Sequence, residues 1–443
     1  MLYNQLQQDA AAIGWNFYGP VLLFILLIVL GVPIWAAIGA GAVTMLVVSD
    51  VLPLSLYGES LFDGIDAFAL TAVPLFILTG DVLVRTGLSR KFLDVADALT
   101  CWARGGFGSA TLLVCGMFSA ISGSDAAGAA AVGRMTIDRL VESGYPRPYA
   151  CALVAAGACT GVLIPPSIAY IIIGLVLGIS ASTLFQAALI PGILILVSLI
   201  VTNIVVNRRH AYEGGGLISW GEWVGNLGRS LKNGWYAFLV PGVIFWGIFS
   251  GRLTPTEAGA TAVVVTIILG FILGTLRLSD FPAMIVSSAK VNGVILPIIA
   301  MSLPLAQTMA ALGVPQGFVT SVTSLTENPY LLILLMIGIL IAAGCVMETT
   351  PNIVILAPIL FPLSQKIGMN EIQFSVMMIT ALGVGFITPP LGLNLFVVSG
   401  LTGEPILKIA RHAVPFVFFM LIVVLMIAYW PALSTTLLPD VYK

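Results

Sequence analysis

The chain has 443 residues, of which 59% are hydrophobic and only 9% are charged, and its formal net charge is −2. About a quarter of the residues in soluble globular domains are charged, so this composition excludes a soluble protein and indicates that a lipid bilayer is the solvent. The small net charge gives no reason to expect a nucleic-acid partner.

The N-terminal segment, MLYNQLQQDAAAIGWNF, lacks the positively charged start of a cleavable signal peptide. We therefore expect the apolar run that begins near Tyr18 to remain in the membrane as the first of many segments.

Apolar runs between Gly, Pro and charged residues predict a series of membrane crossings. They fall near 17–31, 33–49, 66–85, 147–178 and 182–206, and then near 237–251, 256–276, 291–312, 372–400 and 409–431. The polar stretch between the two sets, residues 207–236, is predicted to be a cytoplasmic connecting loop or helix.

Two further apolar segments, 105–143 and 329–365, do not fit a single crossing because each has a polar centre. The centres read Ser122-Gly123-Ser124-Asp125 and Glu348-Thr349-Thr350-Pro351-Asn352. Polar, non-helical backbone at membrane depth is tolerated only inside protein or beside water. Each segment is therefore predicted to be a re-entrant helical hairpin.

The basic residues are distributed unevenly over this layout. Of the 18 Lys and Arg residues, only Arg252, Lys366 and Lys443 lie on one side, and the others lie on the opposite side. Since Lys and Arg are enriched in cytoplasmic loops, the richer side is predicted to be cytoplasmic. Both termini are then predicted to be periplasmic.

The chain also resembles itself at a fixed offset. A shift of 224 residues pairs Gly144 with Gly368, Gly161 with Gly385, Pro165-Pro166 with Pro389-Pro390, and Pro191 with Pro415. Because each half has an odd number of crossings, we expect residues 1–206 and 237–443 to form repeats of opposite orientation. Inverted repeats with interrupted helices are typical of secondary transporters, whose solute site lies near the bilayer midplane.

The two Pro-Pro pairs interrupt the long apolar runs 147–178 and 372–400. Proline removes a backbone donor, so carbonyl groups near each break lose their partners and can bind a cation. The alternative interpretation is a pair of tolerated proline kinks. Asp125 and Glu348 lie at the hairpin tips, where a carboxylate is costly unless it is paired, hydrated or functional; Asp125 could instead cap the second arm of its hairpin.

Five segments together resemble a known family. They are Ala72–Leu83, Ser122–Gly133, Gly144–Ser167, Gly251–Ala260 and Gly383–Leu401. Over about residues 20–430 the chain resembles the large membrane subunit, the DctM-like M subunit, of the tripartite ATP-independent periplasmic (TRAP) transporters, including those for sialic acid.

The resemblance implies an all-α integral membrane protein of the inverted-repeat, elevator type, in which two hairpins and two broken helices slide across a scaffold. It also implies co-transport of Na⁺, a separate small four-helix membrane subunit, and a periplasmic substrate-binding protein in the bacterial inner membrane. The solute would be an organic acid of the sialic acid or C4-dicarboxylate class.

The resemblance also implies site residues. The first sodium site would use Ser122, Gly123, Ser124, Pro165, Pro166 and Ser167. The second would use Thr349, Thr350, Gly385, Thr388 and Pro390. The solute would lie near Ser124, Asp125, Asn352 and Asn394.

Two rival functions follow from the same features. A self-sufficient sodium/dicarboxylate symporter would have similar hairpins but need neither a binding protein nor a small subunit. An intramembrane protease is disfavoured, because no intramembrane Ser/His pair exists and a second aspartate motif is missing. With two histidines, His210 and His412, and no CxxC spacing, the sequence does not predict a transition-metal site.

Overall fold

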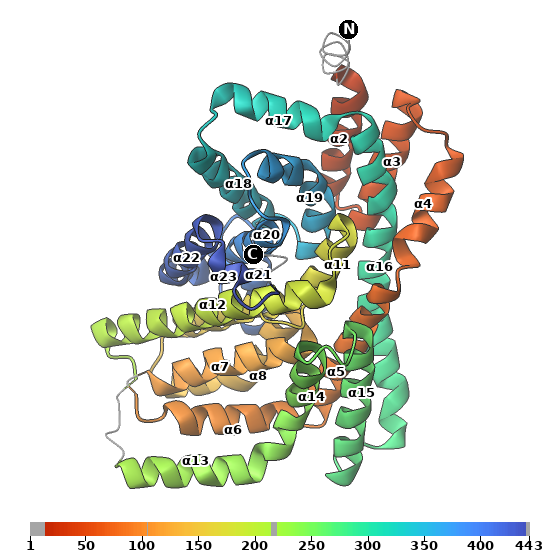
Figure 1. The fold of residues 1–443 in the computed structure, drawn as a ribbon. Helices are drawn as coiled ribbons and strands as arrows, with labels where there is room; N and C mark the ends of the chain where they lie inside the picture. Colours follow the sequence, from red (N-terminus) through yellow and green to blue (C-terminus); the bar gives the residue numbers. More distant parts are fainter. Residues whose placement is uncertain (1–13, 104, 214–218, 440–443) are drawn as a thin grey trace.

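A computed structural model describes residues 14–103, 105–213 and 219–439 (Figure 1). Within these ranges the chain forms α-helices and short 3₁₀ helices and no strand, which confirms the predicted all-α class. The expectation about the N-terminal segment concerns mainly residues 1–13, which lie outside the described residues.

The helices follow one another with short connections. The first half contains α2 (Gly14–Val29), α3 (Ile34–Ser49), α4 (Ser55–Ile65), η1 (Phe68–Thr71), α5 (Ala72–Arg85), α6 (Leu88–Thr100), α7 (Gly106–Ser122), α8 (Asp125–Glu142), α9 (Arg147–Ala158), α10 (Thr160–Leu163), α11 (Ile168–Leu177) and α12 (Ala181–His210). The second half contains α13 (Trp220–Gly234), η2 (Trp235–Phe238), α14 (Leu239–Phe249), α15 (Pro255–Ile272), η3 (Leu278–Asp280), α16 (Phe281–Ala311), α17 (Val314–Leu325), α18 (Pro329–Gly344), α19 (Thr349–Lys366), α20 (Glu371–Gly385), α21 (Leu393–Thr402), α22 (Ile406–Tyr429) and α23 (Ala432–Thr435).

Several helices are long and apolar enough to cross a bilayer. Among the described residues these are Phe68–Arg85, Ala181–His210, Pro255–Ile272, Leu278–Ala311 and Ile406–Tyr429. The pair Arg147–Leu163 and Ile168–Leu177 adds a sixth span if its 41° bend is counted as one broken helix. The other predicted crossings are formed by shorter helices.

Some helices were not expected from the apolar runs. The polar connection predicted at 207–236 contains the end of α12 and the amphipathic helix α13, which starts with a capping box between Ser219 and Glu222. Helix α16 begins at Phe281, ten residues before the predicted start at 291. The prediction missed its first turns because they carry polar residues that break the apolar run. Helices α4, α6 and α17 lie between the predicted crossings, where the sequence also has no continuous apolar run.

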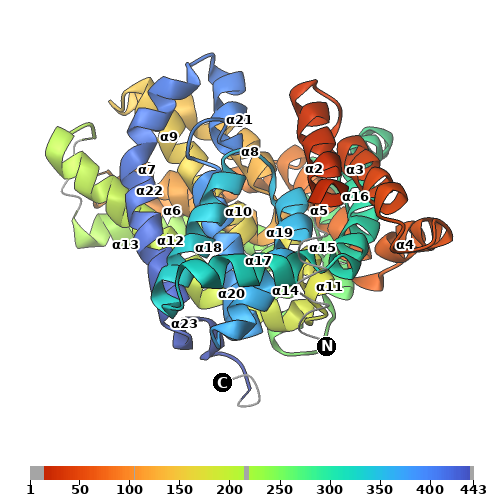
Figure 2. The ribbon, with the colours of Figure 1, turned by 90° about the horizontal axis from the view of Figure 1, so that it is seen from above.

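The buried side chains of the described residues form one large core and two smaller ones. The large core joins α7 to α12 with α18 to α22 and also includes residues of α5, α6 and α14 to α17. The smaller core lies between α3 and α16, with partly buried residues of α2 and α19 packed against it. The smallest core consists of Val82, Leu276 and Met284. Figure 2 shows α2, α3, α4 and α16 gathered on one side of the molecule, with α19 next to them.

The two segments predicted as hairpins each contain two helices that pack against each other, α7 with α8 and α18 with α19. In the first, the chain turns at Gly123, whose φ of 61° favours glycine. Helical structure is also interrupted at both Pro-Pro pairs, between α10 and α11 and between α20 and α21. Both Pro-Pro peptide bonds are cis.

Candidate functional site

The tip of the first hairpin rests directly on the first helix break. A Cβ atom on Gly123 would lie 3.0 Å from the carbonyl oxygen of Pro166 and 3.3 Å from the Cα of Ser167. A Cβ atom on Gly161, just before the break, would lie 2.6 Å from the backbone nitrogen of Asp125. These contacts leave no room for a side chain, so the two glycines allow tip and break to form one site.

The hydroxyl groups at this tip and at the adjoining break differ in whether they have a hydrogen-bond partner. Ser124 is the N-cap of α8 and its Oγ accepts a bond from the Ala127 nitrogen (3.4 Å). The Oγ of Ser167 donates to the carbonyl of Val162 (2.8 Å). Ser122 is 2% exposed, and its Oγ has no partner among the described residues. Ser122 therefore has the hydroxyl that is available to a ligand.

Asp125 is 2% exposed at the first turn of α8. Ser124, rather than Asp125, caps this helix. The Oδ1 of Asp125 accepts a hydrogen bond from the Ala126 nitrogen (2.9 Å), while the Oδ2 of Asp125 has no partner among the described residues. Glu348, the N-cap residue of α19, is the acidic residue of the other tip. Neither acid belongs to an ion pair in the described ranges, where Asp81, Asp94, Asp97 and Asp138 do.

The second hairpin rests on the second break in a similar way. The backbone nitrogens of Leu391 and Gly392, just after the Pro-Pro pair, both donate to the carbonyl of Cys345 (3.3 and 3.1 Å). A Cβ atom on Gly385 would lie 2.6 Å from the backbone carbon of Gly344. Each half of the chain therefore places a hairpin tip against its own broken helix.

The predicted ligand residues at the second tip differ in whether their side-chain oxygens are free to bind an ion. Thr349 is 5% exposed, and its Oγ1 has no partner among the described residues. Thr350 is also buried. The Oγ1 of Thr388 donates to the carbonyl of Val384 (2.8 Å), and Pro390 is exposed at the surface. Thr349 is thus the counterpart of Ser122 in the second half.

The two predicted solute-binding amides, Asn352 and Asn394, are fully buried. The Nδ2 of Asn352 donates to the carbonyl of Met347 (2.9 Å), and that of Asn394 donates to the carbonyl of Ala155 (3.2 Å) and approaches the Sγ of Cys159 (3.4 Å). The Oδ1 atoms of both lack a partner in the described part of the chain. Asn394 therefore links α21 to the first broken helix.

Unpaired polar atoms concentrate at this site. Nine buried side-chain atoms in the described residues have no hydrogen-bond partner, and five of them belong to Ser122, Asp125, Thr349, Asn352 and Asn394. Buried polar atoms are nearly always paired in folded proteins, so this concentration indicates a place for ligands or water.

Sequence reasoning did not single out Tyr170 or Cys159. The hydroxyl of Tyr170 is fully buried without a partner in the described ranges, and Tyr170 lies 224 residues before Asn394. The same offset that pairs the prolines could have identified it. Cys159 donates to the carbonyl of Gly383 (3.2 Å), so it joins the two broken helices next to the site.

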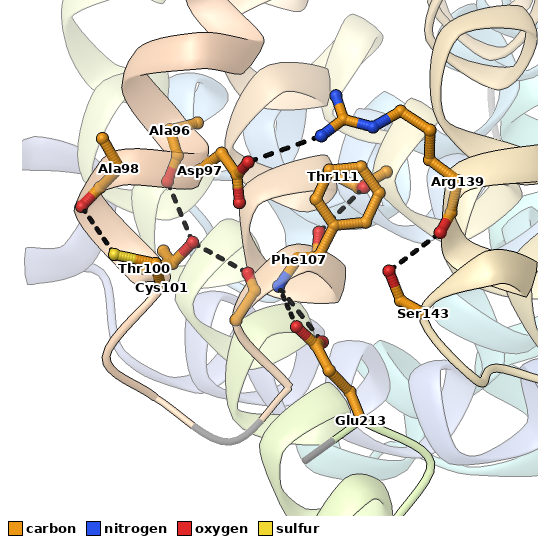
Figure 3. A network of polar contacts seen from close by, with 11 residues as sticks. Ala96, Asp97, Ala98, Thr100, Cys101, Phe107, Thr111, Arg139, Ser143 and Glu213 are labelled. Atoms are coloured by element: carbon orange, nitrogen blue, oxygen red, sulfur yellow. Dashed lines mark hydrogen bonds and ion pairs between the residues drawn. The ribbon is translucent and has the colours of Figure 1, made fainter. Parts of the chain in front are cut away.

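A second polar network fixes the base of the first hairpin, away from the tip (Figure 3). The carboxylate of Glu213 accepts bonds from the Phe107 nitrogen (3.0 and 3.1 Å) and from the Tyr145 hydroxyl (2.9 Å). Burial and the neighbouring carboxylate of Glu213 raise the pKa of Tyr145. Arg139 pairs with Asp97 (3.5 Å) and lies over the Phe107 ring. The loop after α12 thus holds the start of α7 in place.

Residues 21–433 match the family described as the tripartite ATP-independent periplasmic transporter, DctM component. The chain is 35% identical to the C4-dicarboxylate TRAP transporter large permease protein DctM of Pseudomonas aeruginosa, covering 90% of this chain and 92% of that protein. It is 33% identical to the isethionate TRAP transporter permease protein DctMQ of Oleidesulfovibrio alaskensis, covering 94% of this chain but only 65% of that longer protein. It is 29% identical to the sialic acid TRAP transporter large permease protein SiaM of Vibrio cholerae, covering 93% and 96%.

Among solved structures, the fold is similar to the YdaH transporter of Alcanivorax borkumensis, with a TM-score of 0.62 over 95% of this chain and all of that one, at 15% identity. This likeness concerns the fold alone. The relatives named above are permease proteins, so the expectation of a transporter rather than an enzyme is confirmed. The chain is a multi-pass membrane protein that belongs to the DctM-component family of the tripartite ATP-independent periplasmic transporters.

Proposed function

We propose that this chain is the solute-carrying subunit of a sodium-coupled secondary transporter that imports an organic acid across the bacterial inner membrane. A periplasmic substrate-binding protein delivers the solute, and a separate small four-helix membrane subunit completes the complex. The observation that carries the proposal is the group of unpaired polar atoms on both hairpin tips and beside both helix breaks.

The sodium ions bind where each tip meets its break. Hard cations prefer oxygen ligands, and Ser122 and Thr349 supply free hydroxyl oxygens at the two tips, while proline breaks leave backbone carbonyls without helical partners. The remaining ligands come from Gly123, Ser124 and Pro165–Ser167 in the first half. In the second half they come from Thr350, Gly385, Thr388 and Pro390.

The solute binds between the tips, near Ser124, Asp125, Asn352 and Asn394. This region holds two carboxyl groups, those of Asp125 and Glu348, and no Lys or Arg forms an ion pair with either acid in the described ranges. In their ionised form these groups repel an anionic solute until cations neutralise them, because charge interactions are strong away from bulk water. Sodium binding is therefore a condition for binding the acid, which is the physical requirement of a symporter.

The membrane potential supplies enough free energy for uphill import. Each positive charge that moves inward gains about 2.3 kcal/mol per 100 mV, so two sodium ions gain roughly 4.6 kcal/mol before any concentration gradient is counted. One negative charge on the solute would cancel about half of that gain. Import of a monoanion with two sodium ions thus remains favourable.

Transport proceeds by an elevator movement of two inverted repeats. In support, Cys159 donates to Gly383, which lies 224 residues later, the same offset that aligns the two halves. Residues equivalent by symmetry touch each other only near the symmetry axis.

The names of the relatives guide the choice of solute. They are associated with C4-dicarboxylates, isethionate and sialic acid, all of which are organic acids. The DctMQ protein is longer than this chain, and we propose that its unmatched part corresponds to the small subunit, which here is a separate polypeptide.

The test is uptake into proteoliposomes that contain this chain with the small subunit. Labelled sialic acid and succinate are offered with and without an inward sodium gradient, and with and without the binding protein. Uptake that requires both sodium and the binding protein supports the proposal. Uptake that ignores the binding protein would favour a self-sufficient symporter, and uptake that ignores sodium would overturn the assignment of the tips as sodium sites.

A further inference from the structure

A narrow apolar groove lies where α2, α3 and α16 meet α19, the second arm of the second hairpin. Its volume is about 190 Å³. Its lining is apolar throughout and includes Phe24, Ile38, Met45, Met309, Ile355 and Ile359. No polar side chain lines it, which excludes an ion, a carboxylate or any other polar solute as its occupant.

The groove lies at the edge of the smaller core. Ile355 and Ile359 of α19 pack against that core, whereas Ile353 and Leu360 of the same helix belong to the large core. Helix α19 therefore contacts both cores, and the groove is a space beside its contact with the smaller core that side chains leave unfilled. An empty groove forfeits the dispersion contacts of the atoms that line it.

The volume of the groove limits what can occupy it. A helix with its side chains is about 10 Å across, so a segment of another subunit does not fit into this volume. An apolar cavity of about 150 Å³ in another protein stays dry and accommodates benzene. The groove is thus large enough for hydrocarbon but too narrow for a protein element.

The groove also opens toward the lipid. Ile25, in its lining, is 49% exposed, and its neighbours Leu22 and Leu26 on α2 are 56% and 53% exposed. An apolar surface of this kind on a membrane protein faces the bilayer. A lipid tail can enter from this side without its headgroup leaving the interface.

We propose that an acyl chain of a membrane phospholipid occupies the groove between α19 and the helices α2, α3 and α16. The acyl chain fills the space that side chains leave beside the contact between α19 and the smaller core. The proposal rests on the groove itself and does not depend on the transport function proposed above.

The test uses the full chain in nanodiscs made with a phospholipid that carries a photoreactive diazirine in its acyl chain. After illumination, labelled residues are identified by mass spectrometry. We expect label on residues that line the groove, including the buried Met45 and Met309, which bilayer lipid cannot reach from outside.

Two variants fill the groove, Ile355→Trp and Ile359→Phe, and Ile268→Trp on the exposed face of α15 is the matched control. Only variants that elute as a single folded species are compared for labelling. Loss of the groove label in the folded filling variants, with no loss in the control, supports the proposal. Absence of label on Met45 and Met309 in the wild type, label that persists in the folded filling variants, or label that disappears when the small subunit is added would overturn it.

Discussion

At the scale of single residues, the site is defined by polar atoms that the protein leaves unpaired. Ser122 ends the first arm of its hairpin and Thr349 begins the second arm of the other, and each is buried with a free hydroxyl oxygen in the described part of the chain. By contrast, the hydroxyls of Ser167 and Thr388 already donate to backbone carbonyls in their own broken helices. The free hydroxyls should therefore matter for ion binding, and the bonded ones mainly for the shape of the breaks.

Substitution of Ser122 by Ala removes one free oxygen ligand without a change of backbone. We expect the sodium concentration for half-maximal uptake to rise about tenfold, which corresponds to about 1.4 kcal/mol of lost binding free energy. Sodium titration of proteoliposome uptake measures this. Ser324→Ala, at an exposed position, is the control and should leave the titration unchanged; an unchanged titration in S122A would remove Ser122 from the ion site.

Substitution of Glu213 by Gln tests the network at the base of the first hairpin. The carboxylate accepts bonds from Phe107 and Tyr145, and hydrogen bonds to a charged group contribute about 1.5–3 kcal/mol. We therefore expect E213Q to unfold at a lower temperature in detergent. Glu142→Gln, an exposed neighbour on α8, should melt like the wild type, and equal melting of all three proteins would contradict the role of Glu213.

At the scale of helices, each hairpin tip touches its broken helix through glycine. Gly161 and Gly385 stand 224 residues apart and approach backbone atoms of the first and second hairpins, each to 2.6 Å from the position of an added Cβ. Because backbone atoms cannot move aside as flexible side chains do, these two contacts set the position of both tips.

The variants Gly161→Ala and Gly385→Ala should push the tip away from the break and sharply reduce uptake. Gly338→Ala in α18 is the matched control, because no atom lies within 4 Å of the added Cβ. There, replacement of a helical glycine should stabilise the protein by about 0.5–1 kcal/mol. Uptake and thermal melting are measured on all three, and normal uptake by G161A and G385A would show that the close contacts are not required.

At the scale of the whole molecule, the orientation in the membrane follows from the basic residues. Helix α13, with Arg229 and Lys232, belongs to the side rich in Lys and Arg, whereas α17 belongs to the opposite side. The positive-inside rule then predicts that α13 lies in the cytoplasm and that α17 and both termini lie in the periplasm.

Cysteine labelling tests this orientation. Gly225→Cys in α13 and Ser324→Cys in α17, each in a chain without its native cysteines, place one thiol at an exposed position. A membrane-impermeant maleimide added to intact spheroplasts should label the cysteine at 324 and should label the one at 225 only after permeabilisation. The reverse pattern would invert the topology.

The sequence alone determined the all-α class, the family, the places of the hairpin segments and of both helix breaks. These features depend on local chemistry: long apolar runs need a bilayer, proline ends helical bonding, and a polar centre divides an apolar segment. Helix α6 escaped prediction, and α13 was expected only as a loop or helix within 207–236, because amphipathic helices that lie outside long apolar runs leave no continuous apolar signal.

Only the tertiary structure decided which polar groups are free. The sequence contains Ser122, Ser167, Thr349 and Thr388 as equivalent hydroxyl residues, but packing pairs two of them with carbonyls and leaves the other two without a partner among the described residues. It likewise brought Cys159 to Gly383 and left a groove beside α19. Hydrogen-bond partners and unfilled volume depend on contacts between segments distant in the chain, and those contacts exist only once the helices pack together.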